Sequence, residues 1–188
     1  KISEHSTLNP VSNYGLNKHM SELLLQSAAD SFDLSFSVIR FFSLYGIGLK
    51  KQLLWELHKK ISAGMDVIEL YGTGKETRDF LHIEDAAKLL LLVANMVDSS
   101  NRILNAGSGV PLTVKQIVQQ VLLNYESKPK ISFNGASRAG DPQHFCADIS
   151  NLESLGFAPQ INFEDGVCEY INWLDKELDK DKIVTNPD

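Results

Sequence analysis

The sequence lacks several features that would assign a protein to a class at once. It has two cysteines, Cys146 and Cys168, in 188 residues, and neither stands in a metal-binding or redox spacing. So few thiols favour a reducing, cytoplasmic setting. The longest apolar run, residues 89–94, falls far short of the roughly 20 residues of a membrane span, and the polar N-terminus has no hydrophobic signal segment. A formal net charge of −6 argues against a nucleic-acid partner.

Familiar fingerprints of catalysis are missing as well. Gly-x-Gly pairs begin at Gly46, Gly72 and Gly107, but each lacks the third glycine of a dinucleotide-binding loop. CxxC, HExxH and Gly-x-Ser-x-Gly do not occur. The run His82-Ile83-Glu84-Asp85 brings one imidazole near two carboxylates. The start of a helix with solvated acids explains this run better than a metal ion does, so we expect no metal.

The residues that are present favour a globular α/β chain. Hydrophobic residues make up 43% of the sequence, a normal share for one domain or for part of a larger one. Apolar side chains and capping residues predict helices over residues 14–32, 51–63, 85–96, 114–125, 150–156 and 163–178. Apolar, β-branched and aromatic runs predict strands over residues 34–42, 67–71, 78–83, 102–105 and 130–133. The alternation of the two predicts an α/β fold.

The stretch Tyr14-Gly15-Leu16-Asn17-Lys18 opens the first predicted helix. Residues four apart share a helix face, so the Tyr14 phenol and the Lys18 ammonium are expected side by side. A tyrosine has a pKa near 10, and a neighbouring cation lowers that pKa by favouring the phenolate. The pair is therefore a candidate for proton transfer at neutral pH. The spacing alone also fits an ordinary tyrosine and lysine on a helix.

The same helix has an unusually broad apolar surface. Apolar side chains recur along it at Leu16, Met20, Leu23, Leu24, Leu25, Ala28, Ala29 and Phe32. A stripe this wide predicts a helix covered on more than one side, which suits a dimer interface.

Three further residues are candidates for ligand binding. Arg78 follows a glycine turn, and Arg138 precedes Gly140-Asp141. A guanidinium grips two phosphate oxygens at once, so two arginines from separate loops suit a diphosphate. Surface or ion-paired arginines are the alternative. Phe145 either stacks on a base or fills the core.

Several motifs in this order resemble those of one family, the extended short-chain dehydrogenases/reductases that act on nucleotide sugars (the epimerase/dehydratase group). The similar segments span nearly the whole chain: residues 4–10, Tyr14-Gly15-x-x-Lys18 with Glu22, residues 39–46, Tyr71-Gly72-Thr73-Gly74-x-x-x-Arg78-Asp79-Phe80-x-His82-Ile83-x-Asp85, residues 105–109, Arg138-x-Gly140-Asp141 through Ala147-Asp148, and Leu155-Gly156-Phe157-x-Pro159.

The resemblance implies the end of a Rossmann-like parallel sheet followed by a small α/β substrate-binding domain. Residues 1–48 would be a remnant of the dinucleotide-binding domain. Residues 49–178 would mainly bind the nucleotide sugar, with some segments returning to the Rossmann sheet, and residues 179–188 would be a tail. The family's N-terminal Rossmann half, with its glycine loop and catalytic Ser/Thr, does not occur in this sequence. The polypeptide by itself is therefore expected to bind NAD poorly and to turn over little.

The resemblance also implies roles for the candidate residues. Tyr14 would transfer the proton, and Lys18 would assist it and bind the nicotinamide ribose of NAD, or of NADP as the alternative cofactor. Arg78 and Arg138 would hold the substrate diphosphate, and Phe145 would pack on the nucleotide base. Ser43 would contact the substrate where the family usually has asparagine.

The implied activity is that of an NAD-dependent nucleotide-sugar epimerase, similar to UDP-glucose 4-epimerase, in a cytoplasmic homodimer. A 4,6-dehydratase or a reductase of the same family stays open, because the segment that separates these reactions is not in the sequence. A non-catalytic module that binds nucleotide sugars and an unrelated α/β domain are the remaining alternatives.

Overall fold

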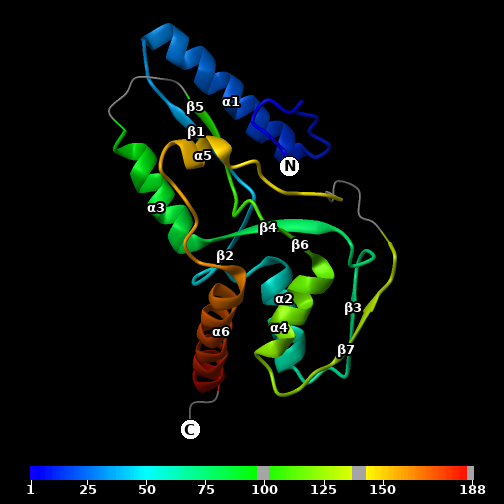
Figure 1. The fold of residues 1–188 in the computed structure, drawn as a ribbon. Coiled ribbons are helices and arrows are strands. Elements are labelled where there is room, and N and C mark those ends of the chain that lie inside the picture. Colours follow the sequence, from blue (N-terminus) through cyan, green and yellow to red (C-terminus); the bar gives the residue numbers. More distant parts are fainter. Residues whose placement is uncertain (97–101, 137–142, 186–188) are drawn as a thin grey trace.

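The computed structural model describes residues 1–96, 102–136 and 143–185 as an α/β chain (Figure 1). The described helices are α1 (Asn13–Phe32), α2 (Gln52–Ser62), α3 (Ile83–Ala94), α4 (Val114–Leu123), α5 (Ser150–Ser154) and α6 (Phe163–Thr185). The described strands are β1 (Ser37–Phe41), β2 (Ser43–Tyr45), β3 (Val67–Leu70), β4 (Thr77–His82), β5 (Arg102–Ala106), β6 (Pro111–Thr113) and β7 (Lys130–Phe133).

The described strands pair in three small sheets. β1 runs parallel to β5, with Ile39 opposite Leu104, and β3 runs parallel to β7. Between these pairs, β4 lies parallel to β2 and antiparallel to β6. Figure 1 shows β1 and β5 beside α1, β4 across the middle of the molecule, and β3 and β7 at the far side.

Strand β4 separates two hydrophobic cores. One cluster, here called the β5 core, joins β5, α3 and α5 and includes Leu81 and Leu89. The other, here called the α4 core, joins α2, α4 and α6 and includes Phe80 and Ile117. Successive strand residues point to opposite faces of a sheet, so the neighbours Phe80 and Leu81 enter different cores. Side chains of this one strand therefore contribute to both cores.

Helix α1 packs far less closely than its sequence suggests. Of its twenty residues, all in the described part of the chain, only Ala29 is buried. Leu23, Leu24 and Phe32 are exposed. The predicted helix is confirmed, and residues 1–96, 102–136 and 143–185 leave most of its apolar surface uncovered.

The predicted elements differ from the structure at three places. The strand expected over residues 34–42 spans only Ser37–Phe41, and the strand β2, which was not predicted, begins at Ser43 and pairs with β4. The short strand β6 was not predicted. Helix α6 continues to Thr185, into the segment expected to be a tail.

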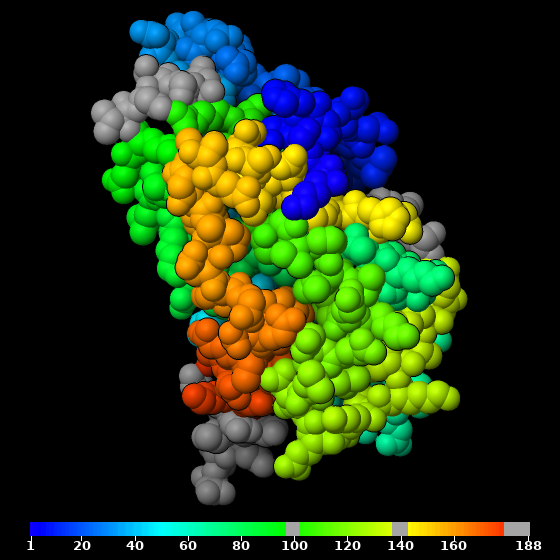
Figure 2. Space-filling view, in the orientation of Figure 1, coloured from blue at the N-terminus to red at the C-terminus, as the bar shows by residue number. Residues whose placement is uncertain are grey.

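The N-terminal segment is hydrogen-bonded to the backbone of residues 146–148, next to the β5 core. The Ile2 N–H donates to the Cys146 carbonyl oxygen at 2.8 Å, and the Asp148 N–H donates to the Ile2 carbonyl oxygen at 2.8 Å. Figure 2 shows this dark-blue segment beside the yellow segment that follows residue 143. None of the described helices combines the length and the hydropathy needed to cross a bilayer.

Candidate active site

Tyr14 and Lys18 lie together at the start of α1. Ser12 caps the helix, because its Oγ accepts a hydrogen bond from the Gly15 N–H at 3.1 Å. The Lys18 Nζ lies 5.6 Å from the centre of the Tyr14 ring. Tyr14 is 73% exposed, so its phenol is open to solvent in this chain. The structure therefore brings the two side chains side by side, as their spacing predicts.

A charged pair holds this helix to β1. Arg40 donates from Nε and Nη2 to the two carboxylate oxygens of Glu22, at 2.9 and 2.6 Å. Its Nη1 donates to the Glu4 carbonyl oxygen at 3.2 Å. The Glu4 carboxylate in turn accepts the Asn105 N–H at 2.8 Å. Residues on α1, β1, β5 and the N-terminal segment are thus joined by one polar network.

The chain reverses direction between α1 and β1, so the first turn of α1 lies toward the carboxyl end of β1 (Figure 1). Ser43 follows that strand end and is half-buried opposite Phe80 of β4. Catalytic and binding sites of parallel α/β sheets lie at the carboxyl ends of the strands. Tyr14 and Ser43 are therefore at the end of the sheet where a ligand is expected.

The candidate ligand-binding residues gather around β4. The half-buried Arg78 donates to the Thr77 carbonyl oxygen at 2.9 Å. The Phe145 N–H donates to the same carbonyl oxygen at 3.3 Å. The Phe145 ring stacks on Phe42, with ring centres 4.3 Å apart and planes at 27°. One face of Phe145 is therefore already engaged by protein. Arg138 lies outside the described residues.

The neighbour of Arg78 is a fully buried carboxylate. Asp79 accepts hydrogen bonds from the Ser108 N–H at 2.6 Å, the Ser108 hydroxyl at 2.8 Å, the Gly109 N–H at 3.1 Å and the Ala147 N–H at 2.9 Å. A side chain at Gly107 would collide with this carboxylate. Asp79 thereby joins β4 to the glycine loop after β5 and to the segment that carries Phe145.

A second carboxylate closes the glycine turn before β4. Glu76 accepts hydrogen bonds at 2.9 Å from the Thr73 N–H, the Gly74 N–H and the Thr73 hydroxyl. These bonds, led by that of the Thr73 N–H, hold the pKa of Glu76 below its ordinary value. Two of the three Gly-x-Gly pairs therefore cradle carboxylates of the chain itself.

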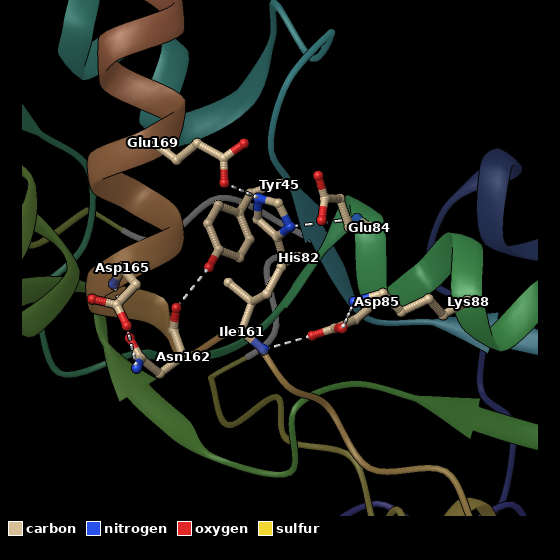
Figure 3. Close-up of polar contacts among 9 residues, drawn as sticks. All are labelled: Tyr45, His82, Glu84, Asp85, Lys88, Ile161, Asn162, Asp165 and Glu169. Atoms are coloured by element: carbon tan, nitrogen blue, oxygen red, sulfur yellow. Dashed lines mark hydrogen bonds and ion pairs between the residues drawn. The ribbon is translucent and has the colours of Figure 1, made fainter.

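The residues of the His82–Asp85 run have structural roles (Figure 3). His82 Nδ1 accepts the Glu84 N–H at 3.4 Å and so caps α3. Asp85 is fully buried and accepts the N–H groups of Gln160 and Ile161, each at 2.9 Å. The expectation of solvated acids is therefore wrong for Asp85, which fixes the segment leading into α6. Among the described residues, no three His, Cys, Asp or Glu side chains are placed to hold a metal ion.

Comparison with known proteins identifies the family. The model of the NAD dependent epimerase/dehydratase family matches residues 1–107, which is more than half of the 188 residues. The chain belongs to this family. The expected α/β fold of an extended short-chain dehydrogenase/reductase is thereby confirmed.

Individual members of the epimerase/dehydratase family align with almost all of the chain. It is 27% identical over 183 residues to a putative UDP-glucose 4-epimerase of Methanocaldococcus jannaschii, covering 92% of this chain and 56% of that protein. It is 29% identical over 176 residues to a dTDP-L-rhamnose 4-epimerase of Burkholderia thailandensis, covering 91% and 48%. The chain thus spans about half the length of these relatives.

Solved structures give the same result for the fold. The structure titled MoeE5 in complex with UDP-glucose and NAD superimposes with a TM-score of 0.86 and 30% identity, over 94% of this chain and 60% of that one. A UDP-N-acetylglucosamine 4-epimerase from Methanobrevibacter ruminantium superimposes with a TM-score of 0.83 and 27% identity, over 94% and 57%.

The residues present fit part of a dinucleotide site. Lys18 and Tyr14 offer an ammonium and a phenol, which are suitable partners for ribose hydroxyls. The turns at Gly72 and Gly107 cannot hold a pyrophosphate as they stand, because Glu76 and Asp79 occupy their N–H groups. The described chain therefore suits the nicotinamide end of NAD and not its phosphates.

Some residues that connect this site stand in the motifs of the sequence, but their partners could not be identified there. Asp79 precedes Phe80 and Leu81 in an expected strand, and a charge next to two apolar strand residues is the available signal of a buried, paired carboxylate. Glu22 and Arg40 carried no comparable signal, since both are common on exposed surfaces.

Proposed function

We propose that the protein containing this chain is an NAD-dependent nucleotide-sugar 4-epimerase. The observation that carries the proposal is the contact between Lys18 and the Tyr14 ring, on a helix whose first turn lies at the carboxyl end of β1. The names of the similar proteins, which include 4-epimerases for UDP-glucose and dTDP-L-rhamnose, support it. UDP- and dTDP-sugars are the substrate classes to test first.

Tyr14 and Lys18 have different roles in the proposed reaction. Tyr14 takes the proton of the sugar 4-hydroxyl and returns it, and Lys18 stabilises the phenolate and binds the nicotinamide ribose. NAD, when bound, supplies the hydride acceptor for the sugar carbon. NADP is the alternative cofactor.

The remaining candidates would hold the substrate. Arg78 and Arg138 bind the diphosphate, Ser43 donates to the sugar or its phosphates, and the free face of Phe145 packs on the base. Arg78 belongs to β4, Ser43 pairs with Phe80, and the Phe145 N–H donates to Thr77, so the three candidates meet the strand within residues 77–80. That placement supports their acting on one ligand.

The proposed domain division follows the two cores. Residues 1–48 belong to the dinucleotide-binding part, to which β5 returns by pairing with β1. Most of residues 49–178 form the substrate part, with α6 closing it. A homodimer is proposed through α1, whose exposed leucines would be buried against a second copy. A cytoplasmic location is proposed because both cysteines are unpaired and Cys168 is exposed.

The deciding experiment is turnover by the intact protein. A panel of UDP- and dTDP-sugars is incubated with the protein and NAD, and the C4 epimer is detected by NMR. Tyr14→Phe should lower kcat by roughly 10²–10⁴-fold, the usual contribution of a general acid–base group. Tyr125→Phe removes a phenol hydroxyl from the α4 core, and it should keep the wild-type kcat.

Three outcomes would contradict the proposal. Unchanged kcat in Tyr14→Phe would remove Tyr14 from the reaction. Sugar binding without turnover of any substrate would favour a non-catalytic module, and a 4-keto-6-deoxy product would favour a dehydratase. The 188-residue chain alone should bind NAD weakly, because two of its three Gly-x-Gly turns are closed by Glu76 and Asp79 and its sequence has no Gly-x-Gly-x-x-Gly loop. Calorimetry showing micromolar binding would contradict this.

A further inference from the structure

Three charged or phenolic side chains follow one another along one face of α1. Tyr14, Lys18 and Glu22 are spaced by four residues, so each lies one turn from the next. Lys18 is thereby placed between a phenol and a carboxylate. In the structure its ammonium lies against the Tyr14 ring, and within the described part of the chain it makes no ion pair.

The carboxylate of Glu22 would ordinarily compete for this ammonium. A lysine and a glutamate four residues apart on a helix attract each other. Such a pair would place a negative charge beside Lys18 and reduce its effect on Tyr14. The arrangement seen therefore depends on whatever keeps Glu22 away from Lys18.

Arg40 of β1 keeps the Glu22 carboxylate away from Lys18 by binding it. Its guanidinium grips both oxygens of Glu22, and the two side chains are 18% and 19% exposed. A bidentate pair of this kind is stronger and more directional than a single lysine contact. The bond from Arg40, together with its charge, holds the pKa of the Glu22 carboxyl below its ordinary value. The Glu4 carbonyl oxygen fixes the guanidinium from another side.

Other charged groups near this pair do not replace Arg40. The Glu4 carboxylate accepts the Asn105 N–H and is thereby held at β5. His19 on α1 adds positive charge near Glu22 when it is protonated. It cannot grip two oxygens, so Arg40 remains the group that determines the direction of Glu22.

We propose that Arg40 is a positioning residue for Tyr14, which acts by holding the Glu22 carboxylate so that Lys18 remains an uncompensated cation beside the phenol. The proposal rests on the proposed role of Tyr14. It differs from a plain anchoring role, in which the Arg40–Glu22 pair only fastens α1 to β1 and either partner is equally necessary.

The test compares Arg40→Met, Glu22→Gln and the double variant in the intact protein. Arg40→Met releases Glu22 toward Lys18, so more phenol stays protonated. The rising limb of kcat/KM against pH should then move up by roughly 0.5–1 pH unit, with the plateau retained. Activity below the limb falls accordingly by about 3–10-fold. The shift should shrink at high salt, because the new pair is exposed.

The other variants separate the two explanations. Glu22→Gln alone and Arg40→Met/Glu22→Gln should keep the limb at its wild-type position, because neither has a carboxylate to compensate Lys18. Arg40→Lys keeps one charged contact to Glu22 but loses the grip on both oxygens, so its limb should lie between those of the wild type and Arg40→Met. A merely anchoring role predicts instead that all variants lacking the ion pair behave alike. That result, or an unmoved limb in Arg40→Met, would overturn the proposal.

A measurement without cofactor or substrate makes the result independent of turnover. With tyrosine labelled at Cζ, the NMR titration midpoint of Tyr14 should rise in Arg40→Met and return in the double variant. If Tyr14→Phe proved fully active, the proposed function would fail, while this titration would still decide the role of Arg40. Equal midpoints in all variants would refute that role.

Discussion

Helix α1 and strand β4 carry the two halves of the candidate site and are built in opposite ways. Of α1, only Ala29 is buried, and the helix is held to β1 mainly by the Arg40–Glu22 pair. In β4, the four residues from Asp79 to His82 are all buried. The proton-transfer candidates thus lie on a lightly packed helix, whereas the binding candidates surround a rigid strand.

The largest expected effect concerns the buried carboxylate of β4. Asp79→Asn turns one acceptor oxygen into an NH₂ group that faces N–H donors, so buried groups lose their partners. We expect a loss of about 3 kcal/mol in the free energy of unfolding, measured with urea. Asp66→Asn, at an exposed position, is the control and should change stability by less than about 0.5 kcal/mol. Equal stability of the two variants would refute the role given to Asp79.

Hydrogen exchange compares the two regions directly. In the 188-residue chain, amides of α1 should exchange roughly 100-fold faster than those of β4 at residues 80–82, since lightly packed elements open locally. The amides of α2, a helix that buries Leu54, Leu57, His58 and Ile61, are the helical control and should resemble β4. If α1 were as protected as α2, a second copy or another segment would have to cover it.

The buried helix α2 should also respond to pH. His58 is fully buried, its Nδ1 lies 2.6 Å from the Tyr125 hydroxyl oxygen, and desolvation lowers its pKa despite the nearby charge of Asp175. As pH falls, His58 is therefore protonated in the unfolded chain before it is protonated in the folded chain. The free energy of unfolding should then decrease as pH drops below about 6.5. Melting temperatures between pH 7.5 and 5.5 test this. His58→Gln should flatten the dependence and the exposed His144→Gln should not; a wild-type slope in His58→Gln would rule it out as the source.

The smallest expected effect is on the KM for the nucleotide sugar, at Ser43, which pairs with β4 just after the end of β1. Ser43 stands where the family usually has asparagine, whose amide reaches farther and adds a donor. Ser43→Asn should lower the KM for the nucleotide sugar by a few-fold, with kcat little changed. Ser43→Ala is the matched control and should raise KM. A higher KM in both variants would indicate that the side chain packs against protein and does not meet the ligand.

The sequence predicted what depends on local spacing. The helix that carries Tyr14 and Lys18 and the contact between these residues both follow from spacing within one or two turns. The boundaries of β7 were also predicted, because Ile131 and Phe133 alternate with polar residues and turn residues lie on both sides.

What the sequence did not predict depends on distant partners. Asp79 meets donors 29 to 68 residues later in the chain, and no spacing rule connects them. The strand β2 was missed because it follows β1 after a single residue, and only their different pairing partners separate the two strands. What covers α1 stays a prediction, because an apolar stripe indicates that a helix can be covered and does not identify what covers it.

The position of Phe42 limits where the chain can bend when the β5 core moves relative to the α4 core. Phe42 is the only residue between β1 and β2, and its ring is stacked on Phe145. Hinged closure of two domains needs a connecting segment whose backbone angles can change freely. A single stacked residue between two paired strands provides no such segment. Any movement of the β5 core against the α4 core should therefore bend at the longer segments that also join them, such as the one between α5 and α6.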